Sequence, residues 1–474
     1  MCGILLSVCH SIYELELIRN RGPDYNSTIT NGDITRYSSV LALRGFEKQP
    51  YGNLQFNGEI YLPVASDTKY VFDLFSSNTV SRALEILDSL DAEYAFTWIE
   101  GNKIYFGRDY FGRRSLLYSF KEDKLVISSI SVIPDMVECE CQFWYVFDKD
   151  TSELKTISRK SQLPAFQFIL DNETTLLKMS EYLHCHSTLL SNFESTFSDS
   201  VKDRLFTTAD DTFAVLFSGG LDCSLIVLYL DKLLPVNCKI DLLNVAFEHR
   251  NSAVKYDVPD RRTSIARHSE FIQLMPNRII NLVTIDVPFS AYLEQKPKII
   301  NLMQPHDTVM DLSISIAFWF AARGIGYVNG VPYHSTHKIL FSGLGADELF
   351  GGYGRHRSAF EYGSWKGLHG SMEMDVLRLP TRNLGRDDRI IADVGKEIRY
   401  PFLHPKLVQF VATCPVNVKC DPRLPVGQGD KRILRALAFK NGLINASAEP
   451  KRAIQFGSKT AKLEGSKQKG GDKI

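Results

Sequence analysis

The second residue of the chain is a cysteine that has the surroundings of a nucleophile, in the opening Met1-Cys2-Gly3-Ile4. The small side chain of Cys2 permits removal of Met1, which leaves a free α-amine beside the thiol. An α-amine has a pKa of about 7.7–8.0, so at pH 7 it is partly neutral and accepts the thiol proton. One residue then supplies both the nucleophile and its base.

Two segments farther along could complete such a site. Asn57-Gly58 places a side-chain amide donor next to a glycine whose backbone N–H can approach a ligand closely. Those are the two donors that stabilise the oxyanion of a tetrahedral acyl intermediate. Asp67 offers a carboxylate for a substrate ammonium group. The residue types therefore indicate acyl transfer from an amine-bearing substrate.

A second set of chemical groups lies past residue 200. Ser218-Gly219-Gly220-Leu221-Asp222-Cys223-Ser224 follows an apolar run at residues 212–217. Where a buried strand meets a helix, free backbone N–H groups and the helix dipole favour an anion, and two glycines let the backbone wrap a phosphate. Asp347 follows another apolar run, at residues 339–341, and could share Mg²⁺ with Asp222.

The elements that must position these groups differ between the two halves of the chain. Up to about residue 150, short apolar runs alternate with turns, as at 94–98, 103–107, 116–120 and 125–130, which predicts stacked antiparallel sheets. Later runs at 212–217, 242–247 and 339–341, with helical spacing at 221–234, predict buried parallel strands and helices. The expected fold class is thus α/β and α+β, with a doubly wound parallel sheet in the second half.

These patterns divide the chain into an N-terminal domain at residues 2–170 and a second domain at 190–456. The polar segment 248–267 is predicted to be a long exposed loop. Residues 457–474 are rich in Gly, Ser and Lys, and we expect a disordered tail there.

Composition excludes several function classes. The 474 residues include 55 Lys plus Arg and 55 Asp plus Glu, so the chain has no built-in field for nucleic acid or an anionic membrane. No apolar run reaches the ~18–20 residues of a membrane span, and nine cysteines, an odd number, do not suggest a disulfide framework. Cys139 and Cys141, or His184 and His186, are poorly spaced for zinc. We expect a soluble cytoplasmic protein that binds small molecules, with no nucleic-acid or membrane partner; the sequence leaves the oligomeric state open.

The N-terminal motifs MCGI, RGPD, NGEIY, SDT and GRDYFGRRSLLY resemble, in this order, those of the class II glutamine amidotransferases. The resemblance implies an N-terminal-nucleophile glutaminase in which Cys2 attacks the glutamine side-chain amide while Asn57 and Gly58 hold the oxyanion. It also implies that Asp67 and Glu59 bind the substrate. The family arginine for the glutamine carboxylate is missing from residues 40–43; Arg44 lies nearby in a different register, and Arg21 is the expected substitute.

The segment 218–224 resembles the PP-loop of ATP pyrophosphatases, which split ATP between its α- and β-phosphates; no Gly-Lys-Ser/Thr closes it as in a Walker loop. Together with SGLGADELFGGY at 342–353 and EIRYPFL at 397–403, it resembles the asparagine synthetase domain. The implied cofactors are ATP and Mg²⁺, with Mg²⁺ on Asp222 and Asp347. The nucleotide contacts that the resemblance implies are Phe217, Ser218, Gly219, Gly220, Asp222, Ser224, Val245, Ser342, Gly343 and Asp347.

Within this family, KYDVPDRR at 255–262 and EPKRAIQFG at 449–457 look like a group distinct from ordinary asparagine synthetases. Ordinary synthetases also have a glutamate where this chain has Leu344. Leucine accepts no proton, so we expect slow asparagine formation. Glu348 is expected to point elsewhere if the segment is helical.

Three hypotheses for the function follow. The first is a glutamine-hydrolysing asparagine synthetase, in which ammonia from glutamine displaces AMP from an aspartyl-adenylate and gives asparagine, AMP and pyrophosphate. The second is an enzyme that adenylates a different acceptor, because specificity depends on pocket shape. The third is a catalytically weakened relative that binds nucleotide and serves as an interaction protein.

Overall fold

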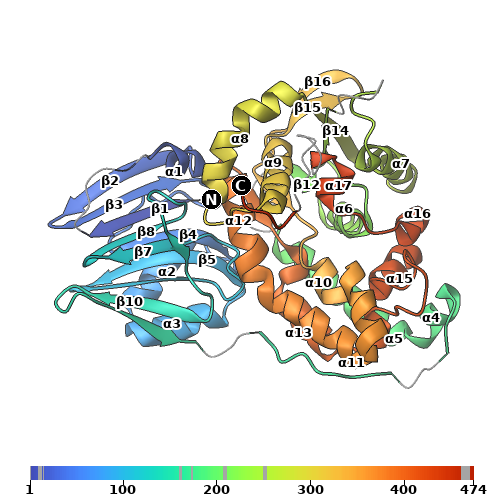
Figure 1. Cartoon of the computed structure of the whole chain (residues 1–474), viewed down its shortest axis with the longest axis horizontal. Helices are drawn as coiled ribbons and strands as arrows, with labels where there is room; N and C mark the ends of the chain where they lie inside the picture. The colour runs from blue at the N-terminus through green and yellow to red at the C-terminus, as the bar shows by residue number, and fades with distance from the viewer. Residues whose placement is uncertain are drawn as a thin grey trace.

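The structure is a computed structural model that describes residues 2–8, 13, 15–159, 163–171, 175–205, 211–248, 254–460 and 470–474. It has two domains that pack side by side (Figure 1). The N-terminal domain is built on two antiparallel sheets, and the C-terminal domain is built on one mixed sheet with helices around it. Among the described helices, none has the length and apolar character needed to cross a lipid bilayer.

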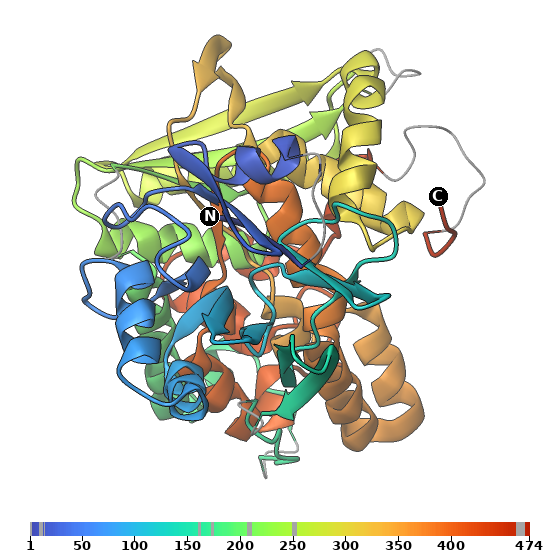
Figure 2. The same cartoon turned by 90° about the vertical axis from the view of Figure 1, so that its left-hand side faces the viewer.

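The two N-terminal sheets lie face to face, in front of the rest of the molecule in Figure 2. The first sheet has the spatial order β2 (Tyr25–Asn31), β3 (Ile34–Val40), β1 (Gly3–Val8), β8 (Lys124–Ser128), β7 (Leu117–Lys121) and β9 (Val137–Glu138). The second has the order β11 (Glu153–Ser158), β10 (Phe143–Asp148), β6 (Lys103–Arg108), β5 (Ala92–Glu100) and β4 (Leu54–Ile60). Leu6 from β1 and Phe106 from β6 belong to one buried core, which confirms the predicted stacked sheets.

Three helices complete this domain: α1 (Glu16–Arg21), α2 (Asp67–Ser76) and α3 (Val80–Ser89). Val71 and Phe75 of α2 pack in a second core with Phe96 and Trp98 of β5. Successive strand residues point to opposite faces of a sheet, so β5 supplies side chains to both cores. The outer face of the second sheet is therefore covered by helices.

The C-terminal sheet contains the predicted parallel strands and an antiparallel hairpin that sequence analysis missed. Its order is β16 (Val331–His334), β15 (Ile325–Val328), β14 (Ile279–Val287), β13 (Lys239–Phe247), β12 (Thr212–Leu216), β17 (Ile339–Phe341) and β18 (Glu397–Arg399). The five neighbouring strands β14, β13, β12, β17 and β18 are parallel, whereas β15 and β16 pair antiparallel at the β14 edge. The chain moves outward from β12 to β14 and then returns to β17, so the direction of winding reverses between β12 and β17. Ligands of open α/β sheets bind at such a reversal.

Helices cover both faces of this sheet. They are α4 (Met179–Cys185), α5 (Ser187–Asp203), α6 (Leu221–Leu233), α7 (Pro259–Leu274), α8 (Phe289–Met303), α9 (Val309–Ala322), α10 (Ala346–Phe350), α11 (Gly354–Leu379), α12 (Gly385–Ala392), α13 (Pro405–Thr413), α14 (Val416–Lys419), α15 (Arg432–Lys440), α16 (Ile444–Ala448) and α17 (Ile454–Gly457). Helices α6 and α7 pack on β12 to β14, and α9 packs on the same strands. Because crossovers between parallel strands are right-handed, the reversal places α9 on the opposite face.

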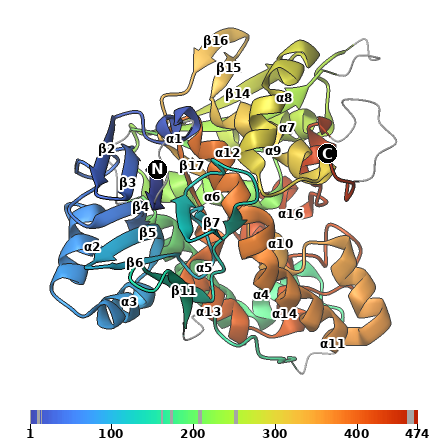
Figure 3. The same cartoon turned by 60° about the vertical axis from the view of Figure 1, so that its left-hand side comes forward.

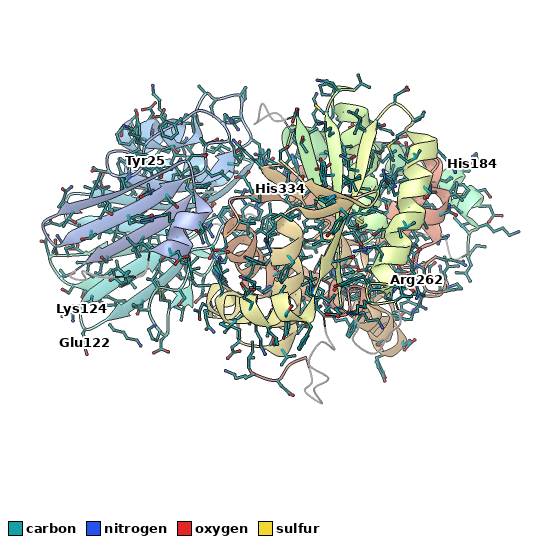
Figure 4. All side chains as sticks on the ribbon, turned by 90° about the horizontal axis from the view of Figure 1, so that it is seen from above. Tyr25, Glu122, Lys124, His184, Arg262 and His334 are labelled. Atoms are coloured by element: carbon teal, nitrogen blue, oxygen red, sulfur yellow. The ribbon has the colours of Figure 1, made fainter. Side chains whose placement is uncertain are left out.

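The polar segment 248–267 is not the exposed loop that sequence analysis predicted, because α7 begins at Pro259; residues 249–253 lie outside the described part. The buried positions of α7 are largely polar, and they include Arg261 and Arg267. Arg261 donates to Asn244 Oδ1 at 2.6 Å and contacts Asp286 at 2.7 Å. The buried face is therefore held by ion pairs, and hydropathy does not reveal it. Figure 4 shows Arg262 near the start of this helix and His184 at the far end of the same domain.

The described residues of the expected tail contact the domain, with residues 470–474 exposed but joined to it by backbone hydrogen bonds. Ser458 and Thr460 are buried next to α17. Asp472 accepts a hydrogen bond from the backbone N–H of Val309 at 2.9 Å through its carbonyl. Residues 461–469 lie outside the described part. The tail thus returns to the start of α9.

Buried ion pairs join the two domains where α1 lies near α12, two helices that Figure 3 labels. Asp388 of α12 contacts Arg21 at 2.7 Å and Arg114 at 3.7 Å, and all three side chains are fully buried. The backbone N–H of Ser115 donates to the same carboxylate at 3.0 Å. A linker follows β11, and the carbonyl of Ile169 accepts a hydrogen bond from Val416 of the C-terminal domain. Charge complementarity therefore fixes how the domains dock.

We expect Asp388→Asn to destabilise the protein by about 3–5 kcal/mol, because two buried arginines lose their shared counter-charge. Urea unfolding followed by circular dichroism measures the effect. The matched control is Asp135→Asn, which removes an exposed carboxylate paired with Lys121 and is expected to change stability by no more than about 0.5 kcal/mol. Equal midpoints for the two variants would contradict this account of the interface.

Candidate functional site

A cavity of about 630 Å³ opens at the carboxyl ends of β12 and β17, where the winding of the sheet reverses. Parallel pairing aligns Val215 with Phe341, so the loops that follow the two strands are neighbours. Eight predicted nucleotide contacts line this cavity: Phe217, Ser218, Gly220, Asp222, Val245, Ser342, Gly343 and Asp347. Eight of the residues predicted from the sequence to contact the nucleotide therefore lie together in the structure.

The other two predicted contacts, Gly219 and Ser224, shape the loop and are not among the lining residues. Gly219 has a φ of +78°, and a Cβ there would lie 2.6 Å from the backbone nitrogen of Ser264, so only glycine fits. The hydroxyl of Ser224 donates to the carbonyl of Gly220 at 2.7 Å. These contacts fix the turn that leads from β12 into α6.

Asp222 and Asp347, the two acidic residues predicted to hold a metal, both form an ion pair with the same ammonium group. The Nζ of Lys431 contacts Asp222 Oδ2 at 2.5 Å and Asp347 Oδ1 at 2.7 Å. Burial raises the pKa of Asp222, whereas Lys431 and Lys451 outweigh burial and lower the pKa of Asp347. The remaining oxygen of Asp222, Oδ1, is buried and has no hydrogen-bond partner among the described residues. Two convergent carboxylates with a free oxygen fit a hard divalent cation.

Glu348 lines the same cavity as Leu344, which corrects the expectation that it points elsewhere. The helix α10 starts only at Ala346, after Gly345 with a φ of +98°, so residues 344 to 348 do not form one helical turn. The hydroxyl of Tyr353 donates to Glu348 Oε1 at 2.6 Å, while Glu348 Oε2 is buried without a described partner. Burial raises the pKa of Glu348 to about 7. A carboxylate able to accept a proton near neutral pH thus stands beside Leu344.

The two unusual segments of the sequence meet at this cavity. Asp260 of the first segment and Lys451 and Arg452 of the second are lining residues. A Cβ on Gly457 would lie 1.9 Å from the carboxylate of Asp260, so the segments touch only because this residue is a glycine. Lys451 Nζ lies 3.5 Å from Asp347 Oδ2. Asp260, Lys451 and Arg452 are additions to the predicted site that the motifs 255–262 and 449–457 could have signalled, whereas Lys431 is an addition that lies in neither motif.

A second, smaller cavity in the N-terminal domain surrounds Cys2. The backbone nitrogen of Cys2 donates to Asn57 Oδ1 at 2.8 Å, and Asn57 Nδ2 is buried without a partner among the described residues. Gly58 also lines the cavity, and a Cβ there would lie 2.2 Å from the carbonyl oxygen of Glu93. Burial raises the pKa of the Cys2 thiol, so it needs a base to ionise. A nucleophile and an unused amide donor thus lie together.

The predicted substrate-binding residues do not all reach this cavity. Glu59 and Asp67 line it, as does Arg44. Arg21 does not: its Nη2 contacts Asp388 and its Nε donates to the carbonyl oxygen of Cys2 at 3.2 Å. Arg21 therefore supports the backbone behind the nucleophile, and the proposed contact with a substrate carboxylate has no basis in this placement.

One arginine connects the two cavities. Arg399 of β18 contacts Glu59 Oε2 at 3.3 Å and Glu397 Oε1 at 2.9 Å, and Glu397 itself lines the cavity around Cys2. The carbonyl of Arg399 accepts a hydrogen bond, 3.0 Å long, from the backbone nitrogen of Ser342. Ser342 in turn lines the larger cavity. Edge strand β18 therefore belongs to both sites.

Comparisons with known proteins find a matching family model and several similar sequences. The family model described as asparagine synthase matches residues 192–364 and 360–441. The asparagine synthetase domain-containing protein YML096W of Saccharomyces cerevisiae is 37% identical over 94% of this chain and 88% of its own length. Asparagine synthetase domain-containing protein 1 of Homo sapiens is 30% identical over 100% of this chain and 97% of its own. Among solved structures, a glutamine phosphoribosylpyrophosphate amidotransferase from B. subtilis, complexed with ADP and GMP, is similar over 45% of this chain and 61% of its own, with a TM-score of 0.26 and 14% identity, too distant to bear on function.

If Lys431 occupies the position at which a divalent cation binds, replacing Lys431 should strengthen the binding of that cation to Asp222 and Asp347. We expect Lys431→Met to lower stability by about 3–5 kcal/mol, because two buried carboxylates lose their cation. We also expect Mg²⁺ to raise the unfolding temperature more in this variant than in the unaltered chain, because no ammonium competes with the ion. Lys440→Met, which removes an exposed partner of Glu194, is the control. An equal effect of Mg²⁺ on all three proteins would contradict the proposed ligand pair.

Proposed function

Because the chain belongs to the asparagine synthetase family and, within it, to the asparagine synthetase domain-containing proteins, we propose that it is a glutamine-dependent, ATP-consuming amide synthetase. Hydrolysis of glutamine at Cys2 yields glutamate and ammonia. At the larger cavity, ATP adenylates the carboxylate of aspartate with release of pyrophosphate, and ammonia displaces AMP to give asparagine. The main support is the pair Asp222 and Asp347 on one ammonium group, inside a cavity lined by the phosphate-binding loop.

In the first half-reaction, the residues around Cys2 divide the work. With Met1 removed, the nitrogen that now donates to Asn57 Oδ1 becomes an amine that takes the thiol proton. The thiolate attacks the amide carbon, and Asn57 Nδ2 and the backbone of Gly58 stabilise the oxyanion. Ammonia leaves as the thioester forms, and water then releases the acid and regenerates the thiol.

In the second half-reaction, the PP-loop positions the phosphates of ATP. Asp222 and Asp347 would hold Mg²⁺, which neutralises charge on the phosphates when bound. The N-terminus of α6 faces the same anion, while Lys431 and Lys451 supply positive charge for the departing pyrophosphate. Glu348, which lines the same cavity, would accept the proton that ammonia loses as it attacks the adenylate.

A second candidate function is nucleotide binding without synthesis, in an interaction protein. It is favoured by Leu344, which replaces the glutamate of ordinary synthetases with a side chain that accepts no proton. The acceptor also stays open, because the cavity lining includes arginines that could take acids other than aspartate, among them Arg378 and Arg382.

Release of pyrophosphate from Mg²⁺–ATP, with and without aspartate, tests the proposal. We expect aspartate to stimulate release, and Asp222→Asn to weaken Mg²⁺–ATP binding by roughly 10–100-fold through loss of a charged contact. Cys2→Ala, in the N-terminal domain, is the control for Asp222→Asn. It is expected to abolish ammonia release from glutamine and to leave ATP binding unchanged. A rate of pyrophosphate release that is the same with and without aspartate favours a different acceptor. No pyrophosphate release under either condition favours the interaction protein.

The proton acceptor can be tested separately. If Glu348 has this role, the rate of amide formation at a constant concentration of unprotonated ammonia rises as the pH rises through about 7, because burial raises the pKa of Glu348 to about 7 and only the ionised form accepts a proton. Glu348→Gln removes this limb of the pH profile and slows the reaction by about 10²–10⁴-fold, whereas Leu344→Glu is expected to raise the rate. A pH profile unchanged by Glu348→Gln would assign the proton to another group.

A further inference from the structure

Gln49 is a buried polar residue beside the nucleophile that the mechanism above does not use. Its side chain lines the cavity around Cys2 and is only 2% exposed. The side-chain nitrogen, Nε2, lies 3.6 Å from Cys2 Sγ. We propose that Gln49 is a catalytic residue of the first half-reaction, which donates an N–H···S hydrogen bond to the sulfur of Cys2 and stabilises the thiolate. This inference rests on the proposed hydrolysis at Cys2 and adds a residue to it.

Backbone contacts determine which end of the Gln49 amide faces the sulfur. The backbone N–H of Phe56 donates to Gln49 Oε1 at 2.7 Å, and the carbonyl of Phe56 accepts a hydrogen bond from Gln49 Nε2 at 2.9 Å. An amide turned the other way would place donor against donor and acceptor against acceptor. The end of Gln49 that faces Cys2 is therefore the nitrogen, which carries hydrogens, and not the oxygen, which would repel a thiolate.

The second hydrogen of Gln49 Nε2 can move to the sulfur when Cys2 ionises. A side-chain amide nitrogen carries two hydrogens, and one of them goes to the carbonyl of Phe56. The other lies within reach of two acceptors, Thr68 Oγ1 at 3.2 Å and Cys2 Sγ. The hydroxyl of Thr68 is neutral, whereas a thiolate is charged, and hydrogen bonds to charged groups are roughly twice as strong. The contact with sulfur therefore gains strength in the state that attacks the substrate.

The surroundings of Cys2 disfavour its thiolate, so a neutral donor is useful there. Burial raises the pKa of the thiol, and the charge of Glu397 adds to this effect. The α-amine of the chain, a backbone hydrogen bond from Leu41 and the charge of Arg21 lower the pKa but do not outweigh burial. The charged side chains that line the cavity are those of Glu47, Glu59, Asp67, Glu397 and Arg44. Because most of them are acidic, an N–H donor at the sulfur supports the thiolate without a further charge in the cavity.

The amide of Gln49 also connects the nucleophile to the strand that carries the proposed oxyanion donors. Phe56 lies in β4 directly before Asn57 and Gly58, and its N–H and carbonyl both pair with Gln49. The backbone nitrogen of Cys2 donates to Asn57 Oδ1 in the same strand. One buried side chain therefore contacts both the attacking atom and the segment that holds the oxyanion.

The rate at which iodoacetamide alkylates Cys2 in the full chain, measured by mass spectrometry over a range of pH, reports the thiolate without turnover. We expect Gln49→Met to shift the midpoint of this pH–rate curve upward by about one pH unit, the effect of losing one hydrogen bond to a charged group. Gln49→Glu, which turns an oxygen toward the sulfur, is expected to shift the midpoint at least as far.

Two controls separate this role from a general loss of structure. Gln55→Met removes another buried amide that donates to backbone carbonyls, and it is expected to leave the midpoint for Cys2 unchanged. The exposed Cys185 is the internal reference, whose alkylation curve is expected to be the same in every variant. Thr68→Val removes the competing acceptor while Gln49 stays in place, and it is expected to lower the midpoint.

Hydrolysis of glutamine supplies a second measurement. We expect Gln49→Met to lower kcat at pH 7 by roughly 3–10-fold with KM unchanged, because fewer thiolates form while each is somewhat more nucleophilic. If the chain hydrolyses no glutamine but the alkylation midpoint still shifts, only the proposed hydrolysis is overturned. The inference is wrong if neither Gln49→Met nor Gln49→Glu raises the midpoint, if Gln55→Met raises it as far, or if Thr68→Val raises it.

Discussion

The structure depends on opposite charges that are buried together at the boundary of the two domains. Arg399 is the central member: its guanidinium joins Glu397 to Glu59, and its carbonyl holds Ser342. Charges removed from water are stable only when they are paired in good geometry. The interface therefore tolerates one arrangement of the domains, and this arrangement brings a strand of the C-terminal sheet to the wall of the N-terminal cavity.

At each cavity, a basic side chain contacts two of the acids that line it. Lys431 sits between two acids that suit a divalent cation, and Arg44 sits between two acids that suit an ammonium. In the first case Asp222 Oδ1 is buried and has no hydrogen-bond partner among the described residues. In the second case backbone carbonyls fix the arginine. At each site, a basic side chain thus neutralises part of the negative charge of the acids that it contacts.

Sequence analysis anticipated the groups that a local pattern determines. A buried strand, a glycine turn and a helix place Asp222 at the edge of the sheet, and pairing of β12 with β17 brings Asp347 to it. Residues that approach from distant segments could not be anticipated in this way. Lys431 precedes α15 and has no local motif, and the choice between Arg21 and Arg44 depends on which way each side chain turns from its backbone. Helix α7 was missed because its buried face is polar, so its hydropathy resembles that of a loop.

The docking of the domains through side-chain charges has a consequence for how the protein could be encoded. The covalent link between them is the segment that follows β11, which the structure describes at residues 163–171 and 175–178, whereas Asp388, Arg21 and Arg114 make their contacts independently of that segment. A gene split at this point would therefore produce two polypeptides that still recognise each other, and the pair would behave as a heterodimer. The two domains contact each other through buried ion pairs of the kind that can also join separate subunits.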